Sequence, residues 1–308
     1  MPVESDHHQS RYTRRKQGDF AGMITNKYAF PAVILYTSLA MLPALAQNSP
    51  VTTGDPFVPL PEVADVDPDK IALGKKLFYD TRLSENGQYA CATCHQLEHG
   101  GDSGNTKDES HGFTALSINT PSIFNSRYNF RQNWSGSDRT LREQLVKTFD
   151  RHSPFDTSLE TVVERLRQDP ALRTDFNTLY REGLTPDTLV DSLVEFEKSL
   201  VTPNSRFDQY LQGKHEALDD DELAGYELFK NLGCVSCHQG VNIGGNLFQR
   251  FGVFYNYIAE RGETTRADYG RINNTGREMD RFVFKVPSLR NIEVTAPYLH
   301  DGSAKTIE

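Results

Sequence analysis

The 308-residue chain has few cysteines, a deficit of basic charge and, after its amino terminus, no long hydrophobic run. Its 33 basic side chains are outnumbered by 42 acidic ones, so the formal net charge is −9. This balance argues against nucleic acid as a partner, because phosphate binding requires a basic face. Four cysteines are too few for a disulfide framework in a chain of this length. With 37 % hydrophobic residues, the chain is neither disordered nor a multi-pass membrane protein.

The amino terminus has the pattern of a secretory signal peptide. The segment from Tyr28 to Ala46 is uncharged, follows a basic stretch and ends in the small residues that signal peptidase accepts. We interpret residues 1–46 as the signal peptide, with Met23 as a candidate true start. An uncleaved membrane anchor is the alternative, but Pro31 and Pro43 weaken a spanning helix. The sequence therefore predicts export to the periplasm, without a stable membrane span in the mature chain.

The four cysteines form two tight pairs, and a histidine directly follows each pair. These segments are Cys91-Ala92-Thr93-Cys94-His95 and Cys234-Val235-Ser236-Cys237-His238. Sulfurs three residues apart on a helical turn lie side by side and can add to the two vinyl groups of one haem. The following histidine is then placed under the iron as its proximal ligand. A zinc site and a redox disulfide are the alternatives, and the histidine after each pair disfavours both. The sequence thus predicts two covalent c-type haems.

Two haems need four axial ligands, and His95 and His238 are only two of them. Among the remaining histidines, His111 stands out because it lies in a glycine-rich loop that leaves the first haem peptide. Glycine gives a chain the backbone freedom to wrap a cofactor or to move. A solvated loop histidine is the alternative, and spacing alone does not decide between the two.

The pattern of hydrophobic residues predicts helices separated by loops. Asp67-Pro68 is typical of a helix start, Thr157 to Glu160 fits a capping box, and Pro186 opens another helix. Further helices are expected from Leu141 and over an apolar stripe that runs from Leu223 to Phe229, and these stripes are expected in the core. Residues 88–133 show no sustained period and are expected as a loop wrapped on haem. The fold class is therefore all-α, with two cytochrome c-like domains over residues 47–203 and 204–308, each with one haem.

These residues resemble the bacterial di-haem cytochrome c peroxidases, a family that also includes MauG, which oxidises a partner protein. The resemblance extends over nearly the whole mature chain. It is carried by the two haem peptides and by the segments Leu73–Asp80, Arg82–Ser84, Asn119–Ser122, Arg206–Tyr210, Gly244–Phe248, Phe284–Asn291 and Thr295–Gly302.

The resemblance implies that the amino-terminal haem is the peroxide site. In the family, a histidine sixteen residues after the proximal one is a removable distal ligand, and His111 is sixteen residues after His95. The resemblance also implies that an electron on the carboxy-terminal haem makes this loop move and frees a coordination position for hydrogen peroxide. The glycines around His111 suit such a switch.

The sequence departs from the family at the group that moves a proton between the oxygens of bound peroxide. The peroxidases use a glutamate of a Glu-Met pair, whereas this chain reads Arg151-His152-Ser153-Pro154-Phe155-Asp156. Asp156 is the nearest replacement and His152 the next; the alternative is that Asp156 only caps a helix. Trp134 falls where the family places an aromatic residue between the haems, and the resemblance implies that it conducts electrons. Taken alone, it would be a core residue.

The resemblance further implies calcium and leaves one iron ligand open. Asn119, Thr295 and Pro297 match the family's calcium-binding positions, and oxygen ligation suits that hard cation. The distal ligand of the second haem is expected as a methionine, or as a tyrosine in MauG, about fourteen residues after His300. That position lies beyond Glu308, so the end is interpreted as truncated, and Met279 is the only internal substitute.

Three functions follow from these expectations. The first is a periplasmic cytochrome c peroxidase that reduces hydrogen peroxide to water with electrons from a small cytochrome c or cupredoxin. The second is a MauG-like enzyme that oxidises a protein or organic substrate, and the third is a di-haem electron carrier without peroxide chemistry. A homodimer is usual in the family. The acidic balance favours a basic electron donor, because net charge steers association.

Overall fold

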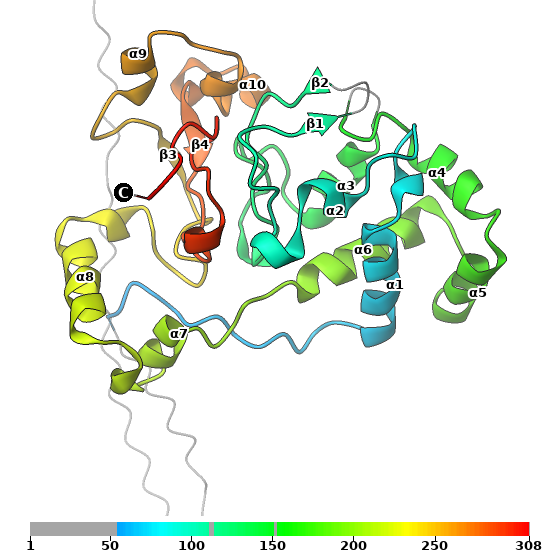
Figure 1. The fold of residues 1–308 in the computed structure, drawn as a ribbon, viewed down its shortest axis with the longest axis horizontal. Coiled ribbons are helices and arrows are strands. Elements are labelled where there is room, and N and C mark those ends of the chain that lie inside the picture. The colour runs from blue at the N-terminus through cyan, green and yellow to red at the C-terminus, as the bar shows by residue number, and fades with distance from the viewer. Residues whose placement is uncertain (1–53, 111–113, 151–152, 308) are drawn as a thin grey trace, which may run out of the picture. The chain divides into compact units, whose positions relative to one another are not determined.

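The computed structural model describes residues 54–110, 114–150 and 153–307. The chain divides into two units, residues 1–48 and 49–308, and every described residue belongs to the second unit. Within the described residues the chain is mostly helical (Figure 1). The α-helices are α1 (Pro68–Phe78), α2 (Cys91–Cys94), α3 (Leu141–Thr148), α4 (Leu159–Leu166), α5 (Pro170–Leu179), α6 (Pro186–Ser199), α7 (Arg206–Leu211), α8 (Asp220–Asn231), α9 (Tyr257–Arg261) and α10 (Ile272–Thr275).

The described β-structure consists of two short antiparallel pairs. Strand β1 (Glu109–Ser110) pairs with β2 (Thr114–Ala115). Strand β3 (Phe248–Arg250) pairs with β4 (Val283–Lys285), with Gln249 opposite Phe284. The prediction of a mostly helical chain is confirmed, and the β3–β4 pair brings two distant parts of the carboxy-terminal half together.

Helix starts follow local sequence signals, with one correction. The Asp67 side chain accepts hydrogen bonds from the Asp69 and Lys70 amides at the start of α1, as predicted. Thr185 caps α6 directly before Pro186. The predicted capping box from Thr157 is wrong by one residue, because Ser158 caps α4 and accepts from the Thr161 amide. Thr157 is instead buried.

The main hydrophobic core lies between α1, α3, α4, α5 and α6. It contains fully buried side chains such as Leu77, Val162 and Leu189. Helices α1 and α6 pack closely at Gly74, where a Cβ atom would overlap the backbone carbonyl oxygen of Ser192. This crossing places the end of α6 beside the first haem peptide, since Phe196 and Leu200 share a second hydrophobic cluster with Cys91.

A smaller core lies around α7 and α8. Phe57, from the start of the described chain, packs there against Leu211 and Tyr226. Leu228 was expected in the core but is 57 % exposed, because α8 turns its Tyr226 face inward and leaves Leu228 outside. None of the described helices is long and apolar enough to span a membrane.

Gly74→Ala tests the crossing of α1 and α6. We expect it to lower the free energy of unfolding by about 1–3 kcal/mol, because overpacking forces the two helices apart. Gly225→Ala in α8 is the matched control, since its Cβ would meet no atom within 4 Å. That control should be stabilising by about 0.5–1 kcal/mol through helix propensity. Urea denaturation monitored by circular dichroism measures both, and equal effects at the two sites would contradict the packing.

Candidate haem and peroxide site

The first haem peptide is fixed by hydrogen bonds within its own loop. Helix α2 is one turn long, and the His95 amide donates to the Cys91 carbonyl oxygen at 2.9 Å. The His95 ring places Nδ1 at 3.1 Å from the carbonyl oxygen of Gly101. A carbonyl can only accept, so Nδ1 carries the proton and Nε2 keeps its lone pair. Gly101 has φ +80°, and a Cβ there would lie 2.8 Å from the Phe124 ring, so this turn requires glycine.

The second haem peptide repeats this geometry in the carboxy-terminal half of the chain. A 3-10 turn (Cys234–Ser236) follows α8, and the His238 amide donates to the Cys234 carbonyl oxygen at 2.9 Å. His238 Nδ1 lies 3.3 Å from the Ile243 carbonyl oxygen, again leaving Nε2 available. Burial lowers the pKa of both His95 and His238 below the usual histidine value. Both rings are therefore neutral at pH 7, as iron ligation requires.

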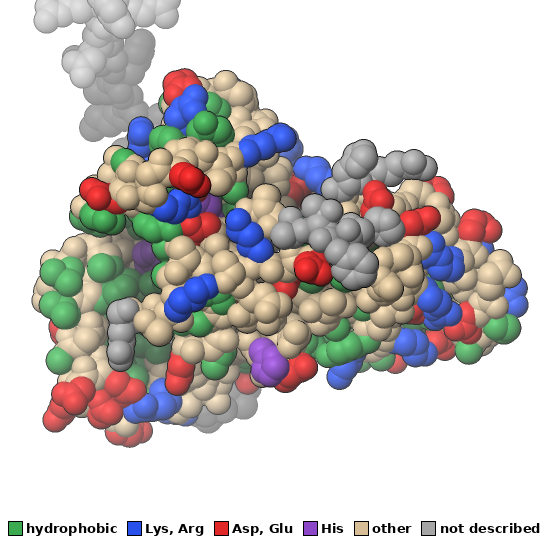
Figure 2. All heavy atoms as spheres, turned by 45° about the horizontal axis from the view of Figure 1, so that its top comes forward, with side chains coloured by type: hydrophobic (Ala, Val, Ile, Leu, Met, Phe, Trp, Pro, Cys, Tyr) green, Lys and Arg blue, Asp and Glu red, His purple; other side chains and the backbone are tan. Residues whose placement is uncertain are grey.

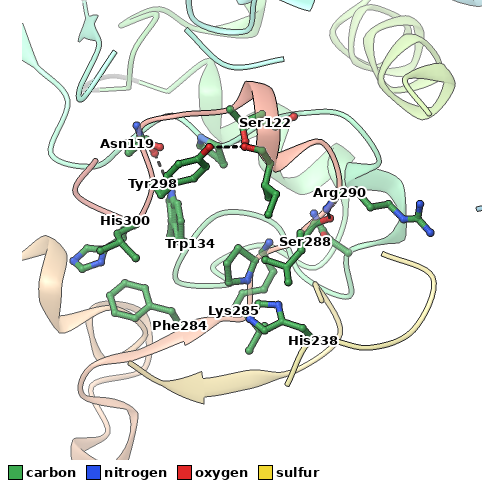
Figure 3. Close-up of a pocket in the computed structure, with 18 of the residues that line it drawn as sticks. Asn119, Ser122, Trp134, His238, Phe284, Lys285, Ser288, Arg290, Tyr298 and His300 are labelled. Carbon is green, nitrogen blue, oxygen red and sulfur yellow. Dashed lines mark hydrogen bonds between the residues drawn. The ribbon is translucent and has the colours of Figure 1, made fainter. Parts of the chain in front are cut away.

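A cavity of about 900 Å³ connects the two peptides. His95, His238, Cys234 and Cys237 line it. Figure 3 shows His238 among the lining side chains. Cys91 and Cys94 are not among its lining residues, since Cys91 packs against the hydrophobic clusters of α1 and α6. Among the described residues none of the four cysteines forms a disulfide, and all four are partly buried. The cavity is large enough for an organic cofactor, since ligand pockets of about 300–1,000 Å³ are typical.

Trp134 lies in the cavity wall and is fixed from both sides. Its Nε1 donates to the Asn119 carbonyl oxygen at 2.9 Å, and its own carbonyl oxygen accepts from the Lys285 amide at 2.8 Å. The indole meets the His300 ring edge to face, with centroids 6.5 Å apart (Figure 3). Trp134 thus lies where residues of both halves of the chain meet.

His300 belongs to a buried charged network. Its Nε2 lies 2.7 Å from Asp268 Oδ1, and both side chains are almost fully buried. Burial raises the pKa of Asp268, but hydrogen bonds from Thr265, Arg261 and His300 outweigh that effect and hold it well below the usual range. Arg261 also pairs with Asp301. Asp268, His300 and Asp301 are spaced closely enough for a metal ion, yet Arg261 already pairs with both carboxylates.

Two ionisable side chains, one basic and one acidic, line the cavity without a partner among the described residues. Lys285 in β4 is 9 % exposed, and burial lowers its pKa to about 8. Glu197 in α6 is 7 % exposed, and burial raises its pKa to about 8. Lys285 lies between Trp134 and His238 in Figure 3. Burying a charge without a partner is costly, so each marks a place where the cavity holds something more.

The other predicted residues are distributed unevenly around this cavity. Asn119, Thr295 and Pro297 all line it. The side-chain Nδ2 of Asn119 donates to the Asn105 carbonyl oxygen at 3.0 Å. Asp156 is half-buried and is not among the lining residues. His111 and His152 lie outside the described residues. Met279 is 81 % exposed in a 3-10 turn and also does not line the cavity.

Comparisons with known proteins identify the family. A sequence model of the family described as di-haem cytochrome c peroxidase matches residues 68–216. The cytochrome c551 peroxidase of Nitrosomonas europaea is 39 % identical over 272 residues, which are 88 % of this chain and 80 % of that protein. The chain belongs to the di-haem cytochrome c peroxidase family. The predicted resemblance is thereby confirmed.

Further members show the same relation. The cytochrome c peroxidase Ccp of Escherichia coli is 37 % identical over 262 residues. These residues are 85 % of this chain and 56 % of that protein. Among solved structures, a MauG-like protein associated with microbial copper homeostasis is similar, with a TM-score of 0.72 and 29 % identity. That similarity covers 81 % of this chain and 77 % of the other.

The residues around the cavity fit the two haems that the family's description implies. Each Cys-x-x-Cys-His segment has its histidine held through Nδ1, which leaves Nε2 for iron. The ammonium of Lys285, buried without a partner, suits the carboxylate of a haem propionate. Sequence reasoning missed Lys285 and Glu197 as cavity residues. Lys285 lies in the segment Phe284–Asn291, which resembles the family, but the resemblance assigned it no role. Glu197 lies in a helical stripe that predicted only core packing.

The covalent sites are tested by haem counting. The wild-type chain should retain two haems after acid-acetone extraction, because thioether bonds survive it. The double variant Cys234→Ala/Cys237→Ala should retain one. Intact mass and the pyridine haemochrome spectrum measure the content, and the double variant Cys91→Ala/Cys94→Ala is the matched counterpart. Two retained haems in either double variant would contradict the assignment.

Proposed function

We propose that this protein is a cytochrome c peroxidase that reduces hydrogen peroxide to water. The single observation that supports this most is its 39 % identity to a cytochrome c551 peroxidase over 88 % of the chain. The cavity between His95 and His238 is consistent with it, because peroxide reduction needs a reacting iron and an electron entry site near each other. When bound, haem supplies an iron that coordinates peroxide and accepts electrons singly.

The haem-binding residues follow from the two peptides. Cys91, Cys94 and His95 hold the first haem, at which peroxide reacts. Cys234, Cys237 and His238 hold the second haem, which receives electrons. In this assignment the chain forms two cytochrome c-like domains, residues 47–203 and 204–308. Although residues 54–60 fall in the first range, they pack on the carboxy-terminal domain. Phe57 packs on Tyr226, and the Leu60 amide donates to the Asp208 carboxylate.

His111 is the removable ligand of the first haem in this proposal. Its loop follows β1 and is bounded by the short pair β1–β2. Because each of these strands has only two residues, separating them costs little free energy. A segment that opens easily suits a ligand that must leave the iron. The proton that moves between the peroxide oxygens is carried by the segment that contains His152 and Asp156, with Asp156 as the first candidate and His152 as the second.

Trp134 carries electrons between the two haems in this proposal. Its ring lies in the cavity wall, held by Asn119 and next to His300. The carbonyl oxygens around Asn119, Thr295 and Pro297 are the proposed calcium site, since oxygen ligands suit that ion. Calcium there would fix the Trp134 contact through Asn119.

The electron donor docks, in this proposal, where α8 leads into the second haem peptide. Leu228 and Leu232 are 57 % and 65 % exposed there. The first turn of α8 carries Asp220, Asp221 and Glu222. Figure 2 shows acidic side chains near hydrophobic ones at the edge of the molecule where Figure 1 places α8. A hydrophobic centre with an acidic border suits a small basic cytochrome c or cupredoxin. Residues 1–46 would direct the protein to the periplasm, where such donors occur, and a homodimer is part of the proposal.

Turnover under controlled reduction tests the proposal. Hydrogen-peroxide consumption with a reduced donor should begin only after one electron per chain has been added. In His111→Gly it should begin in the fully oxidised protein, because the coordination position is already open. A stopped-flow peroxide assay measures both with calcium present.

Two results would redirect this proposal. Absence of turnover in every oxidation state would contradict peroxidase activity. Wild-type protein that reacts when fully oxidised and then oxidises an added protein substrate would support the MauG-like alternative, which the similarity to a MauG-like structure favours.

Trp134→Ala separates electron transfer from chemistry. We expect turnover to fall at least about tenfold, since an increase of about 1.4 kcal/mol in the activation barrier already gives that factor. Haem content and peroxide binding should stay unchanged. Trp134→Phe keeps a ring but loses the hydrogen bond to Asn119, and it should retain an intermediate rate. Equal rates in all three proteins would remove Trp134 from the electron path.

A further inference from the structure

Glu197 is a buried carboxyl that the proposed peroxidase mechanism does not use. It lies near the end of α6, lines the cavity, and is 7 % exposed. Its side chain makes no hydrogen bond or ion pair with any residue that the structure describes. The neighbouring buried carboxylate on the same helix is different, because Glu195 pairs with Lys198 at 2.7 Å. A buried carboxyl that faces a cavity and has no partner among the described residues indicates a role in what the cavity holds.

The position of Glu197 couples it to the first haem peptide. Burial and, after it, the charge of Glu197 raise the pKa of the Cys91 thiol, so the two groups interact electrostatically. Gln144 of α3 and His95 line the same cavity. Because Cys91 is bonded to the edge of the haem ring in the proposed assignment, a charge on Glu197 and a charge on that ring stabilise or destabilise each other.

Other charged groups on the elements packed against α6 are bound elsewhere or lie at the surface. The paired ones are Lys70 with Asp191, Lys76 with Asp175, Arg142 with Asp187, Lys147 with Asp138, Arg165 with Glu85 and Arg127 with Asp65. The remaining ones, on α1, α3 and α4, are exposed: Asp69, Lys75, Glu143, Glu160 and Glu164. Cys91 and Cys94 are the titratable groups of α2. No cation thus neutralises Glu197 from these elements.

We propose that Glu197 is the redox-linked proton site of the first haem. Glu197 binds one proton from solvent as one electron enters that haem, and it releases the proton when the electron leaves. Charge stays balanced, because the electron removes one positive charge and the proton converts a carboxylate into a neutral acid. The inference rests on the proposed function only for the presence of the first haem.

Electrostatics sets the direction of this coupling. Burial alone raises the pKa of Glu197 to about 8. The positive charge of an oxidised haem favours the carboxylate and lowers that pKa. Reduction removes this charge, and the pKa rises again. Between these two values, reduction and protonation occur together, so the first haem becomes harder to reduce as the pH rises.

The test is the pH dependence of the first haem's midpoint potential. Spectroelectrochemical titration of the calcium-loaded, full-length protein between pH 6 and pH 9 gives this potential, and the variant that keeps only the first haem identifies its signal. In the wild type the potential should fall as the pH rises. In Glu197→Gln this slope should be lost, and the uptake of a proton on reduction, followed with an indicator dye in unbuffered solution, should be lost with it.

Controls separate the site from its neighbours. Glu195→Gln alters a buried acid of the same helix that lies outside the cavity, and it should keep the wild-type slope. Glu197→Asp should keep a slope over a displaced pH range, which also serves if Glu197→Gln fails to fold. Asp102 is the other carboxyl that lines the cavity, and its Oδ1 accepts from the Gly104 amide at 3.2 Å. Asp102→Asn should keep the slope.

The proposal is overturned if Glu197→Gln keeps the wild-type slope or if Asp102→Asn abolishes it. It is also overturned if the wild-type potential does not change with pH. These outcomes are independent of peroxide turnover. A protein that binds the first haem but consumes no peroxide would disprove the peroxidase function and leave this inference to be decided by the potential alone.

Discussion

The structure depends on one hydrogen bond that occurs twice, from a histidine Nδ1 to a backbone carbonyl oxygen five or six residues later. His95 uses Gly101 and His238 uses Ile243. Each bond fixes the tautomer and the orientation of a ring whose Nε2 would ligate iron in the proposed assignment. The backbone around it is correspondingly constrained, since Gly101 has no room for a side chain beside Phe124. The two loops, one in each half of the chain, thus hold their histidine rings by the same kind of hydrogen bond.

The cavity between these rings has its own electrostatic pattern. Lys285 lies near Trp134 and His238, whereas Glu197 lies near Cys91, and neither has a partner among the described residues. By contrast, His300 and Asp268 are saturated by Arg261 and Thr265. The saturated network gives the wall next to Trp134 a fixed charge. The unsaturated groups are free to respond to whatever charge enters the cavity, which is how a protein couples electrons to protons.

Local chemistry in the sequence predicted the haem peptides, the all-α class and most helix starts. Asp67 and Pro186 act over a few residues, and their effect does not depend on the rest of the fold. The predictions failed where tertiary contacts decide: Ser158 rather than Thr157 caps α4, and Leu228 is exposed. The same limit hid Lys285, whose amide meets the Trp134 carbonyl oxygen across 151 residues of chain. No periodicity or motif reports a contact of that kind.

In the proposed assignment, the two haem sites are parts of one cavity and influence each other. An anaerobic redox titration followed by visible absorption tests this most directly. We predict two separate one-electron steps, and the first electron, on the second haem, should also change the absorption bands of the first haem while that haem is still oxidised. Two steps in which each haem's spectrum is indifferent to the other's oxidation state would contradict the account.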